Sequence, residues 1–174
     1  MTAAKTIIQT LSAPALAAAL AGCAPGAIEV PAADREAAPE FSLASVGGGE
    51  VGLDDLSGKV AILDFWATWC SPCHIQAEIL EELKEEFEGE DLEIVSIDTG
   101  EKAEKVRAFV EKNPKPFAVL IDADSKVSDD FQVAALPTVI LLDRQGRIAF
   151  TSVGITEASE LRPVIRTELE KAPA

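Results

Sequence analysis

The stretch Val60-Ala-Ile-Leu-Asp-Phe-Trp-Ala-Thr-Trp-Cys-Ser-Pro-Cys-His-Ile75 decides the fold. Its first half, residues 60–67, is almost entirely apolar and predicts a buried strand. Cys70 and Cys73 follow, where a long amphipathic pattern opens at Pro72 and predicts a helix. Side chains three positions apart on a helix lie about 5 to 6 Å from each other, close to disulfide reach. The stretch therefore predicts a reversible dithiol between a core strand and a helix.

The start of a helix gives the first thiol a chemical role. Unpaired backbone N–H groups and the helix macrodipole favour negative charge there, and they lower the pKa of such thiols to roughly 3.5 to 7.5. We therefore expect Cys70 to attack a partner's disulfide and Cys73, one turn further in, to resolve the mixed disulfide. An inert stapling disulfide is the weaker interpretation, because a four-residue ring constrains the unfolded chain little.

Hydrophobic periodicity places the other elements around this stretch. Strands alternate with helices and are followed by a hairpin and a last helix, which predicts an α/β fold with a mixed central sheet flanked by helices. An N-terminal β-hairpin extension is predicted around Gly47–Gly49. The expected strands are 60–67, 92–97, 117–121, 138–142 and 148–153, and the expected helices are 72–87, 103–112, 127–131 and one that begins near Ser159 or bends at Pro163.

The composition fits one domain with short extensions. The chain has 174 residues, 48% of them hydrophobic, which is enough for a core. Its 30 acidic residues against 15 basic ones give a formal net charge of −15. Such a charge argues against nucleic acid or an anionic membrane surface as an electrostatic partner. We expect a monomer.

The N-terminus has the pattern of a bacterial lipoprotein. Residues 1–22 carry one charge, Lys5, and an apolar segment that ends in Leu20-Ala-Gly-Cys23, which predicts a signal peptide. The last four residues resemble a lipobox, which implies cleavage before Cys23 and lipid attachment to it. An extracytoplasmic protein on a bacterial membrane would follow, on the periplasmic side if the envelope has two membranes. An ordinary signal peptide or an uncleaved anchor is the alternative.

The next segment has no periodic apolar face. Residues 23–40 are rich in Ala and Pro with scattered charge, and they predict a lipid-anchored flexible tether. The folded domain is expected to begin near Phe41 and to comprise residues 41–174.

The motif Leu63-Asp-Phe-Trp-Ala-Thr-Trp-Cys-Ser-Pro-Cys73 resembles the active-site segment of the thioredoxin superfamily. Together with Ala135-Leu-Pro-Thr138, the Asp122-Ala-Asp-Ser125 stretch and the leader, it resembles the TlpA/ResA-type extracytoplasmic thiol-disulfide oxidoreductases. The resemblance implies a thioredoxin fold that exchanges disulfides with protein substrates and an unidentified electron donor. No bound cofactor and no metal are expected. The Ser-Pro pair between the thiols lacks the histidine of strong oxidants, which favours a protein-disulfide reductase.

The resemblance also implies a substrate groove. Pro137 would be a cis proline packed against the dithiol, and the backbone at Leu136 would pair with the bound chain. Trp69 would contact the substrate as well. Gly154 would line the same groove, although a plain turn glycine explains that residue nearly as well.

Asp64 stands in an apolar strand, where a carboxylate is costly unless it is protonated or paired. Thioredoxins carry an Asp at the matching position, which exchanges the proton of the resolving cysteine. The ResA-type pattern instead has Asn there and Glu three residues after the second cysteine, where this chain has Gln76. We therefore assign Asp64 a catalytic role with a raised pKa. A strand Asp that caps or faces solvent is the alternative.

Two other functions use sequence motifs similar to the segment around Cys70 and Cys73. A peroxiredoxin-like thiol peroxidase would need Thr at position 67 in its Pro-x-x-x-Thr-x-x-Cys pattern, but that residue is Ala67. Cys70-Ser-Pro-Cys73-His74 matches the attachment signature of c-type haem. A second axial ligand would be missing, because His74 is the only histidine and Met1 would leave with the leader.

Overall fold

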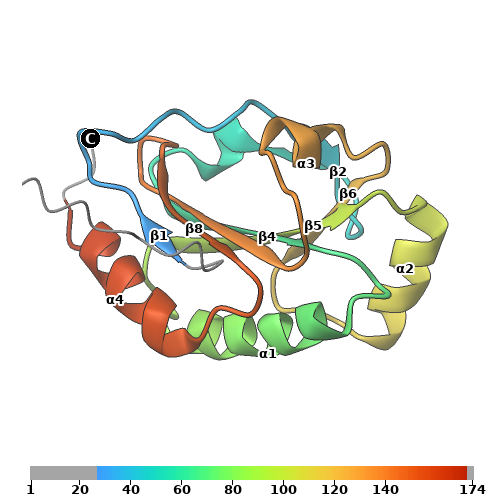
Figure 1. The fold of residues 1–174 in the computed structure, drawn as a ribbon. Coiled ribbons are helices and arrows are strands. Elements are labelled where there is room, and N and C mark those ends of the chain that lie inside the picture. Colours follow the sequence, from blue (N-terminus) through green and yellow to red (C-terminus); the bar gives the residue numbers. More distant parts are fainter. Residues whose placement is uncertain (1–26, 172–174) are drawn as a thin grey trace, which may run out of the picture.

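The computed structural model describes residues 27–171, which fold around a six-stranded sheet (Figure 1). The pairs β4–β5 and β5–β6 are parallel and the other pairs are antiparallel, so the sheet is mixed, as predicted. In spatial order the strands are β1 (Ile28–Glu29), β8 (Ile148–Val153), β7 (Thr138–Leu142), β4 (Val60–Trp66), β5 (Leu92–Thr99) and β6 (Ala118–Asp122).

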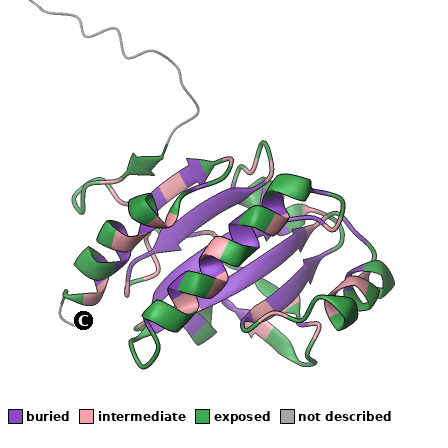
Figure 2. Ribbon diagram, turned by 90° about the horizontal axis from the view of Figure 1, so that it is seen from below, coloured by how far each residue is buried: buried purple, intermediate pink, exposed green. Residues whose placement is uncertain are grey.

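Helices and a hairpin cover the two faces of the sheet, whose central strands are buried (Figure 2). On one face α1 and α4 pack against the strands, and α2 lies beside the first turns of α1. The other face is covered by α3 and by the predicted hairpin. Within residues 27–171 no helix is long and apolar enough to cross a membrane. The bounds are β2 (Ser42–Ala44), β3 (Glu50–Gly52), η1 (Leu53–Leu56), α1 (Ser71–Glu86), α2 (Ala103–Lys112), α3 (Lys126–Asp130) and α4 (Ala158–Leu169).

The central strand β4 connects the core to the dithiol. It is buried along its whole length, and its side chains alternate between the two faces. Ile62 packs with the α1 side of the core and Trp66 with the cluster that holds both cysteines. Asp64, which lies between them in the alternation, therefore faces the α1 side. Because β4 ends at Trp66 and α1 begins at Ser71, the cysteines lie at the edge of the sheet where the parallel strands β4, β5 and β6 end.

Pro163 lies further inside the last helix than its sequence suggests. The helix begins at Ala158, which is close to the predicted start at Ser159, and continues through the proline to Leu169. Proline in the second turn removes one backbone donor, which would have bonded the carbonyl of Ser159. Leu161 and Ile165 are fully buried on the sheet, and this packing holds the helix together across the missing bond.

The segment before Phe41 corrects the predicted domain boundary. Residues 28–40 do not form a free tether: Ile28 pairs with Thr151, and Ala37 forms a bridge with Arg147. The folded domain therefore begins at β1. The prediction of a tether over 23–40 is wrong for 28–40, because backbone pairing and an ion pair, rather than an apolar stripe, hold this arm. The predicted signal peptide and the lipid site Cys23 lie outside the described residues.

Arg35 fastens the arm to two distant parts of the domain. Its guanidinium contacts Asp143 at 3.2 Å and Glu168 at 2.7 Å, and all three side chains are at most 3% exposed. Its Nε donates to the carbonyl of Val30 at 3.0 Å. Burial alone would raise the pKa of Glu168, yet hydrogen bonds from Arg35 and Lys171 bring that pKa below its ordinary value. The cluster thus keeps its carboxylates charged inside the protein.

Replacing Arg35 with alanine should destabilise the domain by about 3 kcal/mol, because two buried carboxylates lose their shared partner. Urea unfolding followed by circular dichroism measures the change. Arg162→Ala is the matched control, because Arg162 pairs with Glu86 at the surface, where such pairs contribute about 1 kcal/mol or less. Equal losses in both variants would show that the arm is not held by this ion cluster.

Candidate active site

The two cysteines form a disulfide at the N-terminus of α1. The S–S distance is 2.03 Å and the Cα atoms are 5.3 Å apart. Cys70 is the N-cap residue and Cys73 lies in the first turn, where Pro72 is tolerated because its missing N–H has no helical partner. The backbone N–H of Cys73 donates to the carbonyl of Cys70 at 3.1 Å. On reduction, a Cys70 thiolate would face the positive end of the helix dipole, as predicted.

The loop before the dithiol is held by a residue that sequence reasoning missed. Glu101 accepts hydrogen bonds from the backbone N–H of Thr68 at 2.5 Å and from its hydroxyl at 2.9 Å, and it also pairs with Lys105. Glu101 follows β5, the parallel neighbour of β4, so both strands end at the same edge of the sheet. An acidic residue just after that strand was the signal in the sequence that could have revealed it.

Asp98 lies behind the same loop. It is fully buried in β5 opposite Trp66, and neither of its carboxylate oxygens meets a donor among the described residues. Burial, a hydrogen bond to Glu101 and the charge of Glu101 together raise the pKa of Asp98 to about 8. With this pKa the Asp98 carboxyl is mainly protonated at pH 7, and its O–H can donate a hydrogen bond to the Glu101 carboxylate.

The residues predicted to line a substrate groove come from three segments of the chain. The Leu136–Pro137 peptide bond is cis, and Leu136 packs against the cluster that contains both cysteines. Gly154 donates its backbone N–H to the carbonyl of Pro137 at 2.8 Å and has φ +94°, a conformation that favours glycine. Trp69 is 68% exposed beside Cys70. The structure therefore places Leu136, Pro137 and Gly154 together beside the dithiol, and Trp69 lies next to Cys70.

Gln76 fixes the loop that carries Gly154. Its side chain is fully buried, accepts a hydrogen bond from the N–H of Thr156 at 2.7 Å and donates one to the carbonyl of Thr156 at 3.3 Å. This two-way bond needs an amide, because a carboxylate could not donate to the carbonyl. Gln76 therefore has a structural role that the sequence did not indicate.

Asp64 has the environment of a proton-exchanging group. It is 1% exposed, accepts a hydrogen bond from the hydroxyl of Ser96 at 2.9 Å, and its second oxygen has no partner among the described residues. Burial raises the pKa of Asp64 to about 7, while the Ser96 hydrogen bond and the charge of Lys115 oppose the shift. The predicted direction of the shift is confirmed, and the carboxyl changes its protonation state near neutral pH.

A cavity of about 300 Å³ lies on the same side of the sheet, and Ser96, His74, Trp66 and Lys115 are among the residues that line it. The ring nitrogens Nε1 of Trp66 and Nε2 of His74 are buried without a partner among the described residues. The cavity is wide and polar enough for water. Ser96, which donates its hydroxyl hydrogen bond to Asp64, also lines this cavity and so links the buried carboxyl to it.

The two alternative chemistries find little support in this geometry. His74 is stacked on Phe109 with ring centroids 5.3 Å apart, so its imidazole packs into the protein beside α2. Ala67 is fully buried and offers no hydroxyl for a peroxidase.

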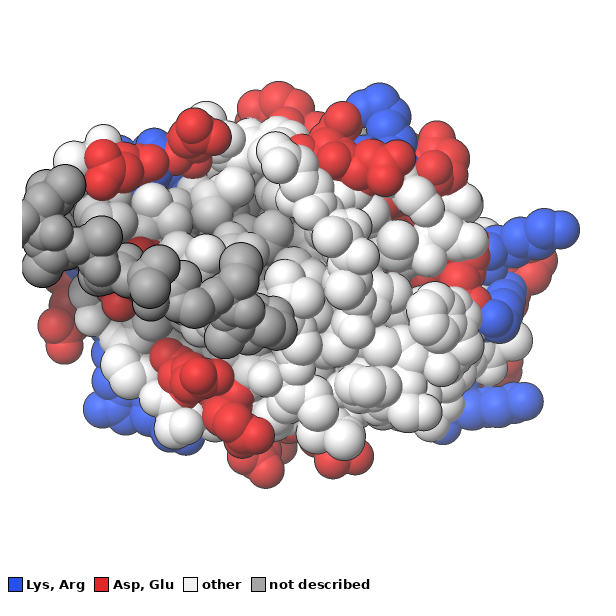
Figure 3. Space-filling view, viewed as in Figure 1, with Lys and Arg blue, Asp and Glu red and all other residues white. Residues whose placement is uncertain are grey.

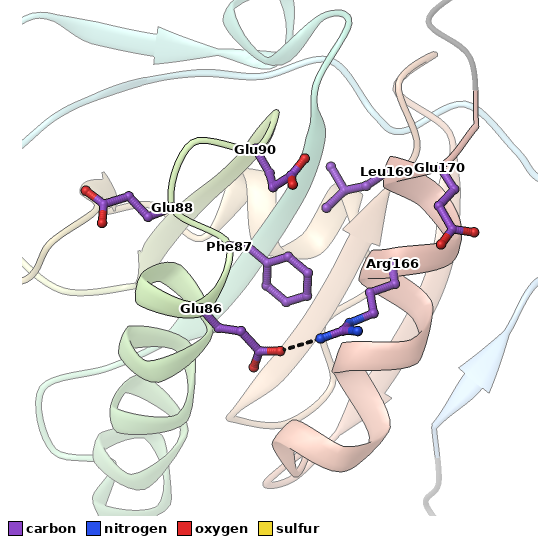
Figure 4. A pocket seen from close by; sticks show the side chains of 7 residues that line it. All are labelled: Glu86, Phe87, Glu88, Glu90, Arg166, Leu169 and Glu170. Carbon is purple, nitrogen blue, oxygen red and sulfur yellow. Dashed lines mark hydrogen bonds and ion pairs between the residues drawn. The ribbon is translucent and has the colours of Figure 1, made fainter.

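A second pocket lies at the other end of α1, away from the dithiol (Figure 4). It has a volume of about 340 Å³, and Glu86 in its wall accepts a hydrogen bond from Arg166 at 2.9 Å. The remaining lining residues are Phe87, Glu88, Glu90, Leu169 and Glu170. Its acidic wall holds no thiol, so it is not part of the redox site.

Known proteins share this arrangement. The chain is 36% identical over 136 residues to the thioredoxin-like protein YneN of Bacillus subtilis, a match that covers 76% of this chain and 79% of YneN. It is 33% identical over 117 residues to the thiol-disulfide oxidoreductase ResA of Bacillus cereus, covering 67% of this chain and 68% of ResA. The structure of a DsbF homologue from Corynebacterium diphtheriae has the same fold, with a TM-score of 0.75 and 24% identity over 84% of this chain and 95% of that one.

The sequence profile of the AhpC/TSA family matches residues 35–151, which include the dithiol, Asp64 and Pro137. The chain therefore belongs to the AhpC/TSA family and, within it, to the TlpA/ResA-type thioredoxin-like proteins, and it is a thiol-disulfide oxidoreductase.

Proposed function

We propose that this chain is a lipid-anchored, extracytoplasmic reductase of protein disulfides. The observation that carries the proposal is the disulfide at the N-terminus of α1, beside an exposed Trp69, with Asp64 buried in the strand that leads to it. The reducing direction is supported by Ser71 and Pro72, which offer no cation to a Cys70 thiolate. Strong oxidants owe their potential to a stabilised reduced form, and these two residues supply no such stabilisation.

The reaction begins with the dithiol form. The Cys70 thiolate attacks one sulfur of the partner's disulfide, a Cys70–partner disulfide forms, and the partner's other sulfur leaves as a thiolate. Cys73 then loses its proton to the Asp64 carboxylate and attacks the Cys70 sulfur. The Cys70–Cys73 disulfide forms and the partner leaves with two thiols. The partner gains two electrons from the Cys70–Cys73 pair. A second protein with a dithiol must then reduce this pair again.

We expect the substrate chain to bind at Leu136. Among residues 27–171 the backbone N–H and carbonyl of Leu136 have no hydrogen-bond partner, although Leu136 lies against the dithiol. An extended segment of a partner can pair with these groups as a short strand. Trp69 would then cover the segment from the other side of Cys70.

The equilibrium of the purified protein with reduced and oxidised glutathione tests the direction. We expect a reduction potential closer to that of thioredoxin, about −270 mV, than to that of the oxidant DsbA, about −120 mV. A value near the DsbA figure would make the protein an oxidase and refute the reductase proposal.

Lipid attachment predicts a clear fractionation result. Cys23→Ser should move the protein from the membrane fraction to the soluble extracytoplasmic fraction, or leave an uncleaved precursor, because the lipid-bearing thiol is gone. Immunoblots of separated fractions measure this. A wild-type protein that partitions to water during detergent phase separation would contradict the lipid anchor.

A further inference from the structure

Residues 67–70 form a tight turn between β4 and the dithiol, which we call the active-site turn. The backbone N–H of Cys70 donates to the carbonyl of Ala67 at 3.1 Å, so Thr68 and Trp69 are the two central residues of the turn. Cys70 is also the N-cap residue of α1. A group that holds Thr68 therefore fixes the turn that presents the Cys70 sulfur and the exposed Trp69 indole.

Glu101 holds Thr68 with both of its carboxylate oxygens. Its Oε2 accepts from the backbone N–H of Thr68 at 2.5 Å, and its Oε1 accepts from the Thr68 hydroxyl at 2.9 Å. Gly100 brings Glu101 to this place, because it has φ +75° and its N–H donates to the carbonyl of Asp122 at 2.8 Å, which turns the chain after β5. Two contacts from one side chain define both the position and the orientation of Thr68.

Asp98 supports Glu101 from inside the protein. Asp98 is fully buried, and when it is protonated its carboxyl donates a hydrogen bond to the Glu101 carboxylate. Without that proton, two carboxylates would face each other in a site with little access to water, where like charges repel strongly. The proton between the two acids therefore helps to keep Glu101 beside Thr68.

The charges that act most on Asp98 are those of Glu101 and of Lys105 in α2. Lys105 pairs with Glu101, but its side chain is exposed, so water screens this pair. Figure 3 shows acidic and basic side chains together at the edge that α2 forms at the right of Figure 1. Beside Asp98, the strands β4 and β6 place the uncharged Trp66 and Ile121. The titratable side chains further along this side, in β4, in α1 and around the cavity, are Asp64, Cys70, Cys73, His74, Glu78 and Lys115.

We propose that Glu101 is a positioning residue for thiol-disulfide exchange, which holds Thr68 so that the active-site turn aims the Cys70 sulfur at a partner's disulfide. A proton shared with Asp98 keeps Glu101 in this position. The inference rests on Cys70 as the attacking thiol, which trapping by Cys73→Ser and Cys70→Ser variants tests separately. It is independent of the lipid anchor and of the reducing direction.

The first experiment measures only the attack by Cys70. In a Cys73→Ser background, the reduced protein forms a mixed disulfide with a capped peptide that has one disulfide and no titratable side chain. This rate is divided by the rate at which iodoacetamide alkylates Cys70 at the same pH, which reports how much of the thiol is ionised. Glu101→Gln keeps only one of the two acceptor oxygens, and at pH 7 it should lower the ratio by about tenfold, because a misplacement of about 1 Å can cost a hundredfold.

Glu104→Gln is the matched control, because it removes one negative charge from the exposed side of α2 and leaves Thr68 held, so its ratio should not change. Thr68→Val loses the hydroxyl but keeps the backbone N–H, and its ratio should fall by about threefold. Thr68→Ser keeps the hydroxyl and should retain the wild-type ratio. An unchanged ratio in Glu101→Gln, or in Thr68→Val where Glu101→Gln does not fold, would refute the positioning role, as would an equal fall in Glu104→Gln.

The pH profile tests the shared proton. The pKa of Asp98 is about 8, so its proton leaves as the pH rises from 7 to 9. With Asp98 otherwise intact, the ratio should then fall by at least about threefold, because the two carboxylates repel each other and Glu101 moves away from Thr68. Asp98→Asn keeps an N–H donor toward Glu101 at every pH, so its ratio should stay constant. Equal profiles with and without Asp98→Asn would show that no proton on Asp98 holds the turn, and would overturn this part of the proposal.

Discussion

Cys73→Ser should accumulate a covalent mixed disulfide with substrate proteins and lose turnover. Cys70, at the N-cap of α1, can still attack a partner's disulfide, but the thiol that would release the partner is missing. Resolution then depends on external thiols, so the exchange rate should fall to that of the uncatalysed reaction. Non-reducing gel electrophoresis after incubation with a disulfide-bearing protein shows the trapped species, and mass spectrometry identifies Cys70 as its site.

Cys70→Ser is the matched control, because it removes the other sulfur of the same disulfide. It should lose turnover to the same extent but trap no partner, since Cys73 is buried one turn inside the helix. A Cys70→Ser protein that traps substrates as well as Cys73→Ser would reverse the assigned roles. Loss of turnover in both variants shows that both thiols are needed. The difference in trapping shows which thiol attacks first.

The sequence predicted the centre of the molecule well because its signals there are local. The apolar run 60–67 and the helical repeat from Pro72 describe β4 and α1 within one or two residues. The cysteines, Asp64 and Pro137 could be named because each is a distinct residue type in a short motif. The helix periodicity also located α2 at 103–112 without error.

The parts that were missed depend on contacts between distant residues. The arm over 28–40 is held by backbone pairing with β8 and by Arg35, whose partners are Asp143 and Glu168, more than a hundred residues away. Glu101 contacts Thr68 only because two parallel strands end together. The position of Glu101 just after a strand hints that it has a role there, but neither Glu101 nor Arg35 gives a local sign of which residue it contacts. Tertiary contacts of this kind become visible only when the sheet order is known.

Asp64→Asn should stabilise the protein at pH 8 by about 2 to 4 kcal/mol. Burial raises the pKa of Asp64 from 3.8 to about 7, so between these values the folded state holds a proton that the unfolded state has lost. The contribution of Asp64 to the free energy of unfolding therefore falls as pH rises through this range and stays low above pH 7. The gain in the variant should shrink toward zero as pH falls to 4. Urea unfolding of both proteins across this range measures it.

The same substitution should slow resolution of the mixed disulfide near neutral pH while leaving the attack by Cys70 largely unchanged. Asp64 lies on the α1 side of the sheet, and in the proposed reaction its carboxylate takes the proton of Cys73, which the asparagine amide could not do. In the wild-type protein the resolution rate should rise with pH through about 7, and this rise should be lost in the variant. Stopped-flow tryptophan fluorescence separates the two steps.

Asp98→Asn distinguishes proton transfer from a change in stability. Asp98 is also fully buried on the same side of the sheet, and its pKa is raised to about 8, so its amide variant should gain stability as well. The amide keeps a donor toward Glu101, so the loop at Thr68 stays held and resolution should stay fast. Gln76→Glu should not rescue Asp64→Asn, because the carboxylate would oppose the carbonyl of Thr156. Unchanged resolution in Asp64→Asn would mean that another group or water takes the proton of Cys73, and Asp64 would then be only a buried acid.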